Sequence, residues 1–557
     1  MQGRPFVRNG ITLLSGHDPV KRCERIADAV SVRDKTLYFC PSPLYCYGLE
    51  KFMSRLEAQA PNSAVLCIEA DPELYELAKN NLTSSLASGK MFRITDICET
   101  ANLCAFVRDS WGVRAFRRIE IIKFTGGWQL SGSLYDSLFE ALRREIAVDW
   151  GNAMTLAKLG RLYIRNALRN LSLLPHFQSI ANLSFGSSPL LVLGAGPSLD
   201  ETLDVLEHRF SGNIHCQNKR PFKIICVDTC LGALKDREIV PDLVVILESQ
   251  FWNLKDFTGC KCWNVRSAID LSAYPASARI FSGEGFIFMT PWTSLRIFER
   301  LKNSGLCPLI ISPLGSVGLT AAEVAKHISN GKIIFSGLDF SFTVDKYHAR
   351  STPGHRSRLN AQTRMKGIAN AAAFEAASFT VISKSGEHVK SSPVMRNYRD
   401  LFEQEFASDP RLFDITGTGL PLGIKTLSYE EAVSVLSGNA EHNTSKDEGV
   451  QLQEKSDKDR ALLAEKLKIF INEEKKRLID LRDILTGGAE PDQIRLNILI
   501  DECDYLYAHF PDFAGGLKPV LEEGSVSQNA LSFLKRVRAE IDPMIKLLEK
   551  TAESLSN

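Results

Sequence analysis

Long apolar runs are absent from this sequence. None approaches the ~20 residues that a transmembrane helix needs, and Met1–Leu14 lacks the apolar stretch of a secretory signal peptide. Charge of one sign is also missing, because 67 Lys and Arg residues balance 66 Asp and Glu residues. No overall charge therefore attracts nucleic acid or an anionic membrane. We expect a cytoplasmic protein without a membrane span that does not bind nucleic acid.

Metal-binding cysteine patterns are missing as well. The 13 cysteines include no C-x-x-C pair, and several lie in or beside apolar runs, where a free thiol behaves as a small hydrophobic group. The odd count and the length of the chain argue against a disulfide framework. We expect free cysteines in a reducing compartment. With 44% hydrophobic and 24% charged residues, the composition is that of a globular protein of about three domains.

Residues 1–150 have the pattern of a small α/β domain. Thr36–Cys40, Ala64–Glu69 and Ile119–Phe124 are expected strands, and a turn and a helix follow the second of them. This region resembles a methyltransferase-like Rossmann unit, in which an acid at a strand end binds a ribose. Cys40-Pro41-Ser42-Pro43 stands where such a unit has its glycine loop, and it cannot present a row of backbone N–H groups. We interpret the region as a structural or partner-binding domain.

Three further segments follow. Residues 151–185 have the pattern of a basic helical connector, residues 186–437 alternate short apolar strands with helices, and residues 438–557 become helical after a polar stretch. The alternation predicts an α/β fold whose central, Rossmann-like domain has a mainly parallel sheet with helices on both faces. An amphipathic helix is expected at Ala461–Leu485. The expected strands of the central sheet are Leu190–Leu193, Lys223–Val227, Leu243–Leu247, Ile280–Phe281, Phe286–Phe288, Leu309–Ile311 and Ile333–Phe335.

A glycine-rich loop follows the first of these strands. Glycines at positions 194 and 196 remove two side chains where the chain turns, so that a phosphate can approach the backbone. The helix that follows brings its positive end to the same point. A tight turn between strand and helix also favours glycine, but the whole string is more specific than G-x-G alone. We predict that the loop binds nucleotide phosphates through Gly194, Ala195, Gly196, Pro197 and Ser198.

Polar residues follow the next two strands. Asp228 and Thr229 end the strand at Lys223–Val227, and Glu248 ends the strand at Leu243–Leu247. Because the carboxyl ends of parallel strands line the ligand crevice of an open sheet, we expect all three side chains near the glycine loop. Asp228 is a candidate ribose or base contact, and capping of the next helix is the alternative.

A second constellation follows the later strands. Ser312, Gly315 and Ser316 precede a helix and are further candidates for nucleotide binding. Asp339 follows the strand at Ile333–Phe335. The loop beyond Asp339 contains two histidines that are candidates for the base that deprotonates an acceptor hydroxyl. It also contains three arginines that are candidates to neutralise a phosphate leaving group, with exposed surface charge as the alternative. The histidines are His348 and His355, and the arginines are Arg350, Arg356 and Arg358.

Four stretches together resemble the motility-accessory-factor family, the flagellin glycosyltransferases of bacteria with glycosylated flagella. They are His17-Asp18-Pro19-Val20, the Gly194–Leu199 loop, the stretch from Gly315-Ser316-Val317 to Ser336-Gly337-Leu338-Asp339, and Thr416-Gly417-Thr418-Gly419-Leu420. The order of the second and third stretches also resembles bacterial sialyltransferases that use CMP-sugars. In those enzymes the first loop binds the nucleotide, and a histidine beyond the aspartate is the base.

The resemblance covers essentially the whole chain. It implies transfer of a nonulosonic acid, such as a pseudaminic or legionaminic acid, from its CMP-activated form to Ser or Thr of flagellin. It also implies a catalytic role for His348, with His355 as the alternative, and an orienting role for Asp339. Two positions depart from the family pattern: Leu338 stands where many members have glutamine, and Glu248 stands where an aspartate is common. The donor, any divalent metal and the oligomeric state are left open.

Two other functions remain open. The central domain is also similar to archaeal 6-hydroxymethylpterin pyrophosphokinases. This is the second candidate enzyme class, because a G-x-G-P-S loop serves ATP equally well. The third candidate is a non-catalytic flagellar assembly factor that retains a degenerate loop. The additional N-terminal and C-terminal regions favour a protein acceptor over a small pterin. Binding of CTP or CMP, of ATP, or of neither separates the three functions.

Overall fold

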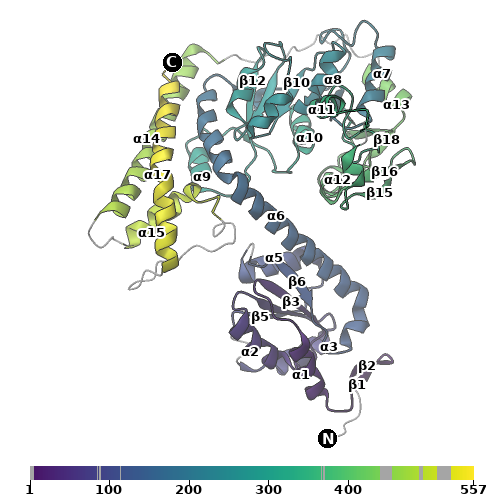
Figure 1. Ribbon diagram of the computed structural model, residues 1–557, viewed down its shortest axis with the longest axis vertical. Coiled ribbons are helices and arrows are strands. Elements are labelled where there is room, and N and C mark those ends of the chain that lie inside the picture. Colours follow the sequence, from purple (N-terminus) through teal and green to yellow (C-terminus); the bar gives the residue numbers. More distant parts are fainter. Residues whose placement is uncertain are drawn as a thin grey trace. The chain divides into compact units, whose positions relative to one another are not determined.

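The computed structural model describes residues 6–84, 86, 89–112, 115–365, 367, 370–438, 455–487, 493–510 and 528–556 (Figure 1). The chain forms two compact units. The first consists of Met1–Arg161 with Tyr507–Ala530, and the second of Leu162–Leu506 with Leu531–Asn557. The division falls within one long helix, α6 (Gly132–Asn170).

The first unit contains a four-stranded parallel sheet in the order β5-β4-β3-β6. Every residue of the central strands β3 and β4 is buried, which is typical of a parallel sheet with both faces covered. An antiparallel hairpin, β1–β2, precedes the sheet. The elements are β1 (Phe6–Arg8), β2 (Ile11–Leu14), α1 (Pro19–Ala29), β3 (Thr36–Pro41), α2 (Leu49–Gln59), β4 (Ala64–Ile68), α3 (Pro72–Asn80), β5 (Phe92–Thr95), α5 (Thr100–Trp111), β6 (Arg118–Ile121) and the 3-10 helix η1 (Gly127–Ser131).

The acid at the end of β4 is bonded inside the first unit. Glu69 is 2% exposed, and its carboxylate accepts hydrogen bonds from Ser42 Oγ at 2.6 Å and Tyr135 OH at 3.1 Å. Burial raises the pKa of Glu69. In a nucleotide-binding Rossmann unit this acid faces the ribose. Its internal partners therefore agree with the interpretation of residues 1–150 as a structural or partner-binding domain, which remains a prediction.

The second unit is built on a ten-stranded sheet. The main strand order is β13-β12-β11-β10-β9-β8-β14-β17-β18, β7 pairs with β12, and all the pairs are parallel. The strands are β7 (Gln178–Ser179), β8 (Leu190–Leu193), β9 (Lys223–Val227), β10 (Leu243–Ile246), β11 (Ser267–Asp270), β12 (Gly285–Met289), β13 (Leu309–Ile310), β14 (Ile333–Ser336), β17 (Leu412–Ile415) and β18 (Lys425–Leu427).

Helices separate these strands and build the core against them (Figure 1). β8, β10 and β14 are buried along their whole length, and the core continues through α7, α8 and α10. The α/β fold class with a large parallel sheet is therefore confirmed. The described helices of this region and its β15–β16 hairpin are α7 (Leu199–Arg209), α8 (Leu231–Asp236), α9 (Arg296–Asn303), α10 (Val317–Ile328), α11 (Pro353–Asn360), β15 (Phe379–Ile382) with β16 (His388–Ser391), α12 (Pro393–Phe406) and α13 (Tyr429–Ser437). Short 3-10 helices are η2 (Leu171–Leu173), η3 (Ile180–Asn182), η4 (Asp228–Cys230), η5 (Phe251–Lys255), η6 (Pro275–Arg279) and η7 (Ala371–Phe374).

The chain ends in helices that are fixed to α9 by a buried ion pair. The elements are α14 (Asp457–Thr486), α15 (Gln493–Glu502), η8 (Asp504–Leu506) and α17 (Gln528–Ser554). Glu474 of α14 is fully buried, and its carboxylate accepts two hydrogen bonds from Arg300 of α9, at 2.6 and 2.8 Å. A buried carboxylate needs such a partner, so the pair joins the helical segment to the sheet within the second unit.

Several element predictions differ from the structure. Ile280–Phe281 is not a strand, because Ile280 ends the short helix η6 and both residues pack as partly buried side chains against the core. The strand expected at Ile119–Phe124 runs from Arg118 to Ile121. The connector at 151–185 begins as the second half of α6. The helix predicted at Ala461–Leu485 starts four residues earlier, at Asp457, because Ser456 forms a capping box with Asp459.

Candidate active site

The strand order places the predicted site residues at one edge of the sheet. From β8 the chain runs through β9 to β13 on one side, and it returns through α10 to β14 on the other side of β8. The pair β8–β14 is thus the point at which the strand order reverses. In open α/β sheets this position, at the carboxyl ends of the strands, is the usual ligand crevice. The glycine loop follows β8, and Asp339 follows β14.

The glycines of the first loop lie against the turn that follows β14. Gly196 N–H donates to the Gly337 carbonyl at 2.8 Å. A Cβ atom on Gly194 would collide with that same carbonyl, and a Cβ atom on Gly196 would collide with the carboxylate of Asp339. Both positions therefore need glycine because two loops touch there, whether or not a phosphate also binds.

Asp339 occupies the positive end of α7. Its carboxylate accepts hydrogen bonds from Ser198 N–H at 2.7 Å and from Ser198 Oγ at 2.5 Å. Asp339 is 2% exposed, and burial raises the pKa of its carboxyl group, whereas Lys384 lowers it. Pro197 precedes the cap residue Ser198, so it lies outside the first helical turn. The donors expected to hold a phosphate at Ser198 are bonded to a carboxylate of this chain instead.

The loop after β17 completes this junction. Leu420 N–H donates to the Asp339 carbonyl at 2.8 Å, and Lys384 N–H donates to the Gly419 carbonyl at 2.8 Å. The Lys384 ammonium reaches Asp414 at 2.8 Å, and both side chains are at most 2% exposed. Burial raises the pKa of Asp414 to about 6, and Lys384 opposes that shift. Three glycine-containing loops, after β8, β14 and β17, thus meet around buried charges. Sequence reasoning did not find Lys384 or Asp414.

The loop beyond Asp339 that contains His348, called the histidine loop below, is hydrogen-bonded to the first glycine loop. Ala349 N–H donates to the Ala195 carbonyl at 3.0 Å, and the backbone N–H of Arg350 donates to Asp200 at 2.9 Å. His348 is partly buried next to Tyr347, with ring centroids 4.8 Å apart. Burial, and then the charge of Arg358, lower the pKa of His348 to about 4. The imidazole is therefore neutral at pH 7, the form that a general base needs, while burial and Arg358 disfavour its protonated form.

The second predicted histidine lies on α11. His355 is partly buried, and its backbone N–H caps against Thr352 Oγ1 at 3.4 Å. Burial, and then the charge of Arg358, lower its pKa as well. Both histidines are thus within electrostatic range of the same guanidinium, and the geometry keeps both as candidates for the base.

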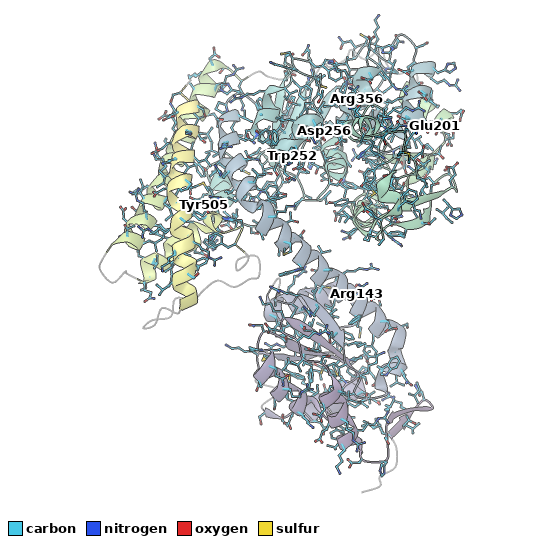
Figure 2. All side chains as sticks on the ribbon, in the orientation of Figure 1. Arg143, Glu201, Trp252, Asp256, Arg356 and Tyr505 are labelled. Atoms are coloured by element: carbon cyan, nitrogen blue, oxygen red, sulfur yellow. The ribbon has the colours of Figure 1, made fainter. Side chains whose placement is uncertain are left out.

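The three arginines of this loop differ. Arg356, which is labelled in Figure 2, pairs with Asp236 of α8 at 2.6 Å and is exposed. Arg350 is exposed, and its guanidinium lies 3.8 Å from Asp200. In Arg358 both terminal nitrogens are buried and have no hydrogen-bond partner in the described part of the chain.

A second polar cluster lies at the ends of β9 and β10. Asp228 accepts hydrogen bonds from Thr229 N–H at 2.8 Å and from Asn253 Nδ2 at 3.0 Å. Burial raises the pKa of Asp228 to about 6. Burial, and then Asp228, raise the pKa of Asp256 to about 7. Figure 2 labels Asp256, which the sequence prediction did not include because it lies in the loop after η5. Glu248, also in this cluster, is exposed.

The N–H groups at the start of α10 have fewer partners within the described chain than those at the start of α7. Ser316 is the cap residue of α10, yet the serine side chain makes no capping hydrogen bond, and the first turn contains no acidic residue. Ser312 and Gly315 precede it and are exposed. Gly315 has φ of +72°, and the ring of Tyr398 lies 3.3 Å from where its Cβ would be. Helix N-termini favour anions, so this terminus suits a phosphate better than that of α7.

Two asparagines of α6 hold the loops that follow β10 and β11. Asn166 Nδ2 donates to the carbonyls of Ser249 at 2.9 Å and Ser272 at 3.1 Å. Asn170 Nδ2 donates to two further carbonyls of the second loop. Both asparagines are at most 1% exposed. The end of α6, within the predicted connector, therefore supports the edge of the sheet that carries the site.

One groove lies between α7 and α13. It has a volume of about 350 Å³, and its lining combines the acids Glu201, Asp204 and Glu430 with the basic residues His208 and Arg209. Figure 2 labels Glu201. Among the described residues, no group of His, Cys, Asp and Glu side chains could hold a metal ion. No helix in the same part of the chain is long and apolar enough to cross a membrane.

Comparisons with known proteins agree with this architecture. Residues 163–345 match the family described as 6-hydroxymethylpterin diphosphokinase MptE-like. An uncharacterized protein of Treponema pallidum (strain Nichols) is 30% identical over 556 residues, which cover 96% of this chain and 91% of that protein. The chain belongs to the same family as this Treponema protein.

A solved structure extends the comparison to the whole fold. The MAf glycosyltransferase from Magnetospirillum magneticum AMB-1 matches with a TM-score of 0.51 and 13% identity, and the match covers 100% of this chain and 85% of that one. The resemblance to the motility-accessory-factor family is thus confirmed at the level of the fold. The MptE-like segment ends at Asp345 and so leaves out His348, Arg358 and Lys384. The fold likeness to the glycosyltransferase includes them.

Proposed function

We propose that this family member is a glycosyltransferase that moves a nonulosonic, sialic-acid-like sugar from a CMP-activated donor to Ser or Thr of flagellin. The observation that carries the proposal is the contact between the histidine loop and the glycine loop, at Ala349 and Ala195, in a chain whose whole length shares the fold of a MAf glycosyltransferase. This contact brings a neutral imidazole to the carboxyl edge of the sheet, where a nucleotide is expected.

The chemistry assigns a role to each element of the edge. The acceptor oxygen bonds to the anomeric carbon while the bond from that carbon to the phosphate oxygen breaks. The hydroxyl proton passes to His348, and CMP leaves with the electron pair on its phosphate. We place that phosphate at the start of α10, near Ser312 and Ser316, because Asp339 already occupies the start of α7. Asp228 and Glu248 remain the candidate contacts to the ribose or base.

The second candidate is a pyrophosphokinase acting on a pterin with ATP, and the MptE-like match over 163–345 favours it. Calorimetry separates the two functions. We expect the full chain to bind CMP and CTP and to bind ATP at least tenfold more weakly. Tighter binding of ATP than of CMP would favour the kinase, and binding of neither would favour a non-catalytic assembly factor.

A further inference from the structure

The guanidinium of Arg358 is a buried charge without a counter-charge. Its terminal nitrogens, Nη1 and Nη2, are inaccessible to solvent, and no described residue accepts a hydrogen bond from them. Only Nε has a weak contact, to the Gly354 carbonyl at 3.5 Å. A guanidinium carries five donors and stays charged at every physiological pH. Burying such a group without partners is costly, so its persistence needs a reason.

The neighbours of Arg358 connect it to the proposed base. Its guanidinium carbon lies 5.9 Å from the centroid of the Tyr347 ring. Gly354, one helical turn before Arg358, lies under the imidazole, because a Cβ atom there would be 2.9 Å from Nδ1 of His348. Burial lowers the pKa of Arg358, and Tyr347 opposes that shift; no carboxylate of the described chain contributes. The charge of Arg358, beside His348, is therefore not compensated by a carboxylate of the described chain, although the Glu375 carboxylate acts on Tyr347.

The other two arginines of the loop give an internal comparison. Arg356 has a carboxylate partner in Asp236, and Arg350 lies beside Asp200. Both are exposed, whereas the guanidinium nitrogens of Arg358 are buried. Surface ion pairs of this kind contribute little and need no ligand to explain them. Among these three residues, Arg358 has the environment of a binding group.

We propose that Arg358 binds an anionic oxygen group of the donor beside the reacting carbon; this rests on the proposed function. In a CMP-activated nonulosonic acid the anomeric carbon carries both a carboxylate and the phosphate oxygen. Either anion can pair with a planar guanidinium through two parallel hydrogen bonds. Because Arg358 lies in the same cluster as His348, an anion held there brings the anomeric carbon close to the group that takes the acceptor proton.

The test uses the full chain with Arg358→Gln and, as a matched control, Arg356→Gln two positions earlier. Binding of CMP, of a CMP-activated nonulosonic acid and of inorganic phosphate is measured by calorimetry, and thermal unfolding is measured with and without each ligand. Arg358→Gln should weaken donor binding by about 10- to 100-fold, the usual effect of losing a charge-assisted pair. Arg356→Gln should change it less than about twofold, as expected for an exposed pair.

The melting temperature of the ligand-free protein distinguishes a binding role of Arg358 from a structural one. Without ligand, Arg358→Gln should melt at the same or a higher temperature than wild type, because the variant removes a buried, uncompensated charge. If Arg358→Gln weakens binding of CMP as well as of the CMP-activated acid, the phosphate is the anion that Arg358 binds. If it weakens binding of the CMP-activated acid and leaves binding of CMP unchanged, the anion is the carboxylate. Unchanged donor binding, or a ligand-free melting temperature well below that of Arg356→Gln, would overturn the proposal. If wild type binds phosphate through Arg358 but no nucleotide, the proposed function fails and the anion site stands.

Discussion

Substituting Gly196 by alanine tests how the three glycine loops are held together. The added methyl group would collide with the carboxyl group of Asp339 and the carbonyl of Gly337. That carbonyl cannot move freely, because it accepts the Gly196 N–H at 2.8 Å. Overpacking in a buried site costs about 1–3 kcal/mol, and a weakened charge-assisted hydrogen bond between Ser198 and Asp339 costs about 1.5–3 kcal/mol more.

We therefore expect Gly196→Ala to lose on the order of 3 kcal/mol of stability. In a unit of this size that corresponds to a melting temperature lower by roughly 5 °C, measured on the ligand-free chain by scanning calorimetry. Gly367→Ala is the control, because an added Cβ there meets nothing within 4 Å. If Gly196→Ala melts like wild type and loses only CMP binding, the glycine serves a phosphate alone, and our account of the loop contact is wrong.

Three further predictions follow from the site and the helical segment. His348→Ala should reduce turnover by about 100- to 10,000-fold with little change in CMP affinity; a loss below tenfold in both His348→Ala and His355→Ala, measured as transfer to purified flagellin, would remove both from the role of base. Burial, and then Asp228, raise the pKa of Asp256 to about 7 in the folded chain. The stability that the protonated carboxyl group contributes is therefore complete below about pH 4, the unfolded pKa, and is lost as the pH rises through 7. The melting temperature of Asp256→Asn minus that of wild type should therefore increase from pH 5 to pH 8. A difference that stays constant over this range would contradict the assignment. Glu474→Ala should cost about 3–5 kcal/mol, because it leaves Arg300 without its buried partner, and a melting temperature equal to that of wild type would show that the ion pair does not join α14 to α9.

The fold was predictable where apolar runs are continuous. Leu190–Leu193 and Lys223–Val227 are strands with the expected bounds, since both are short and consist mainly of apolar residues. Ser267–Asp270 and Leu412–Ile415 were missed because each contains an acid within the strand. Ile280–Phe281 is the opposite case, a predicted strand that does not form, because its side chains pack against the core without joining the sheet. Short apolar segments cannot be assigned from periodicity alone.

The candidate site was predictable as a set of strand ends but not as a set of contacts. The sheet brings Gly196, Ser198 and Asp339 together, as expected from parallel strands. That Asp339 bonds to Ser198 depends on side-chain directions that no spacing encodes. Asn166 lies in the segment that the sequence predicts as a basic helical connector, and Lys384 lies in the turn between β15 and β16. The contacts of both residues join segments that are far apart in the chain, so the sequence pattern does not predict them.

The most direct test of the central claim is the intact mass of flagellin after incubation with the full-length protein and a CMP-activated nonulosonic acid. We predict a mass increase equal to one or more sugar residues with wild type, and at least a 100-fold slower increase with His348→Ala, within the usual range for loss of a general base. If flagellin gains no mass although the protein binds CMP, the assignment as a flagellin glycosyltransferase is contradicted.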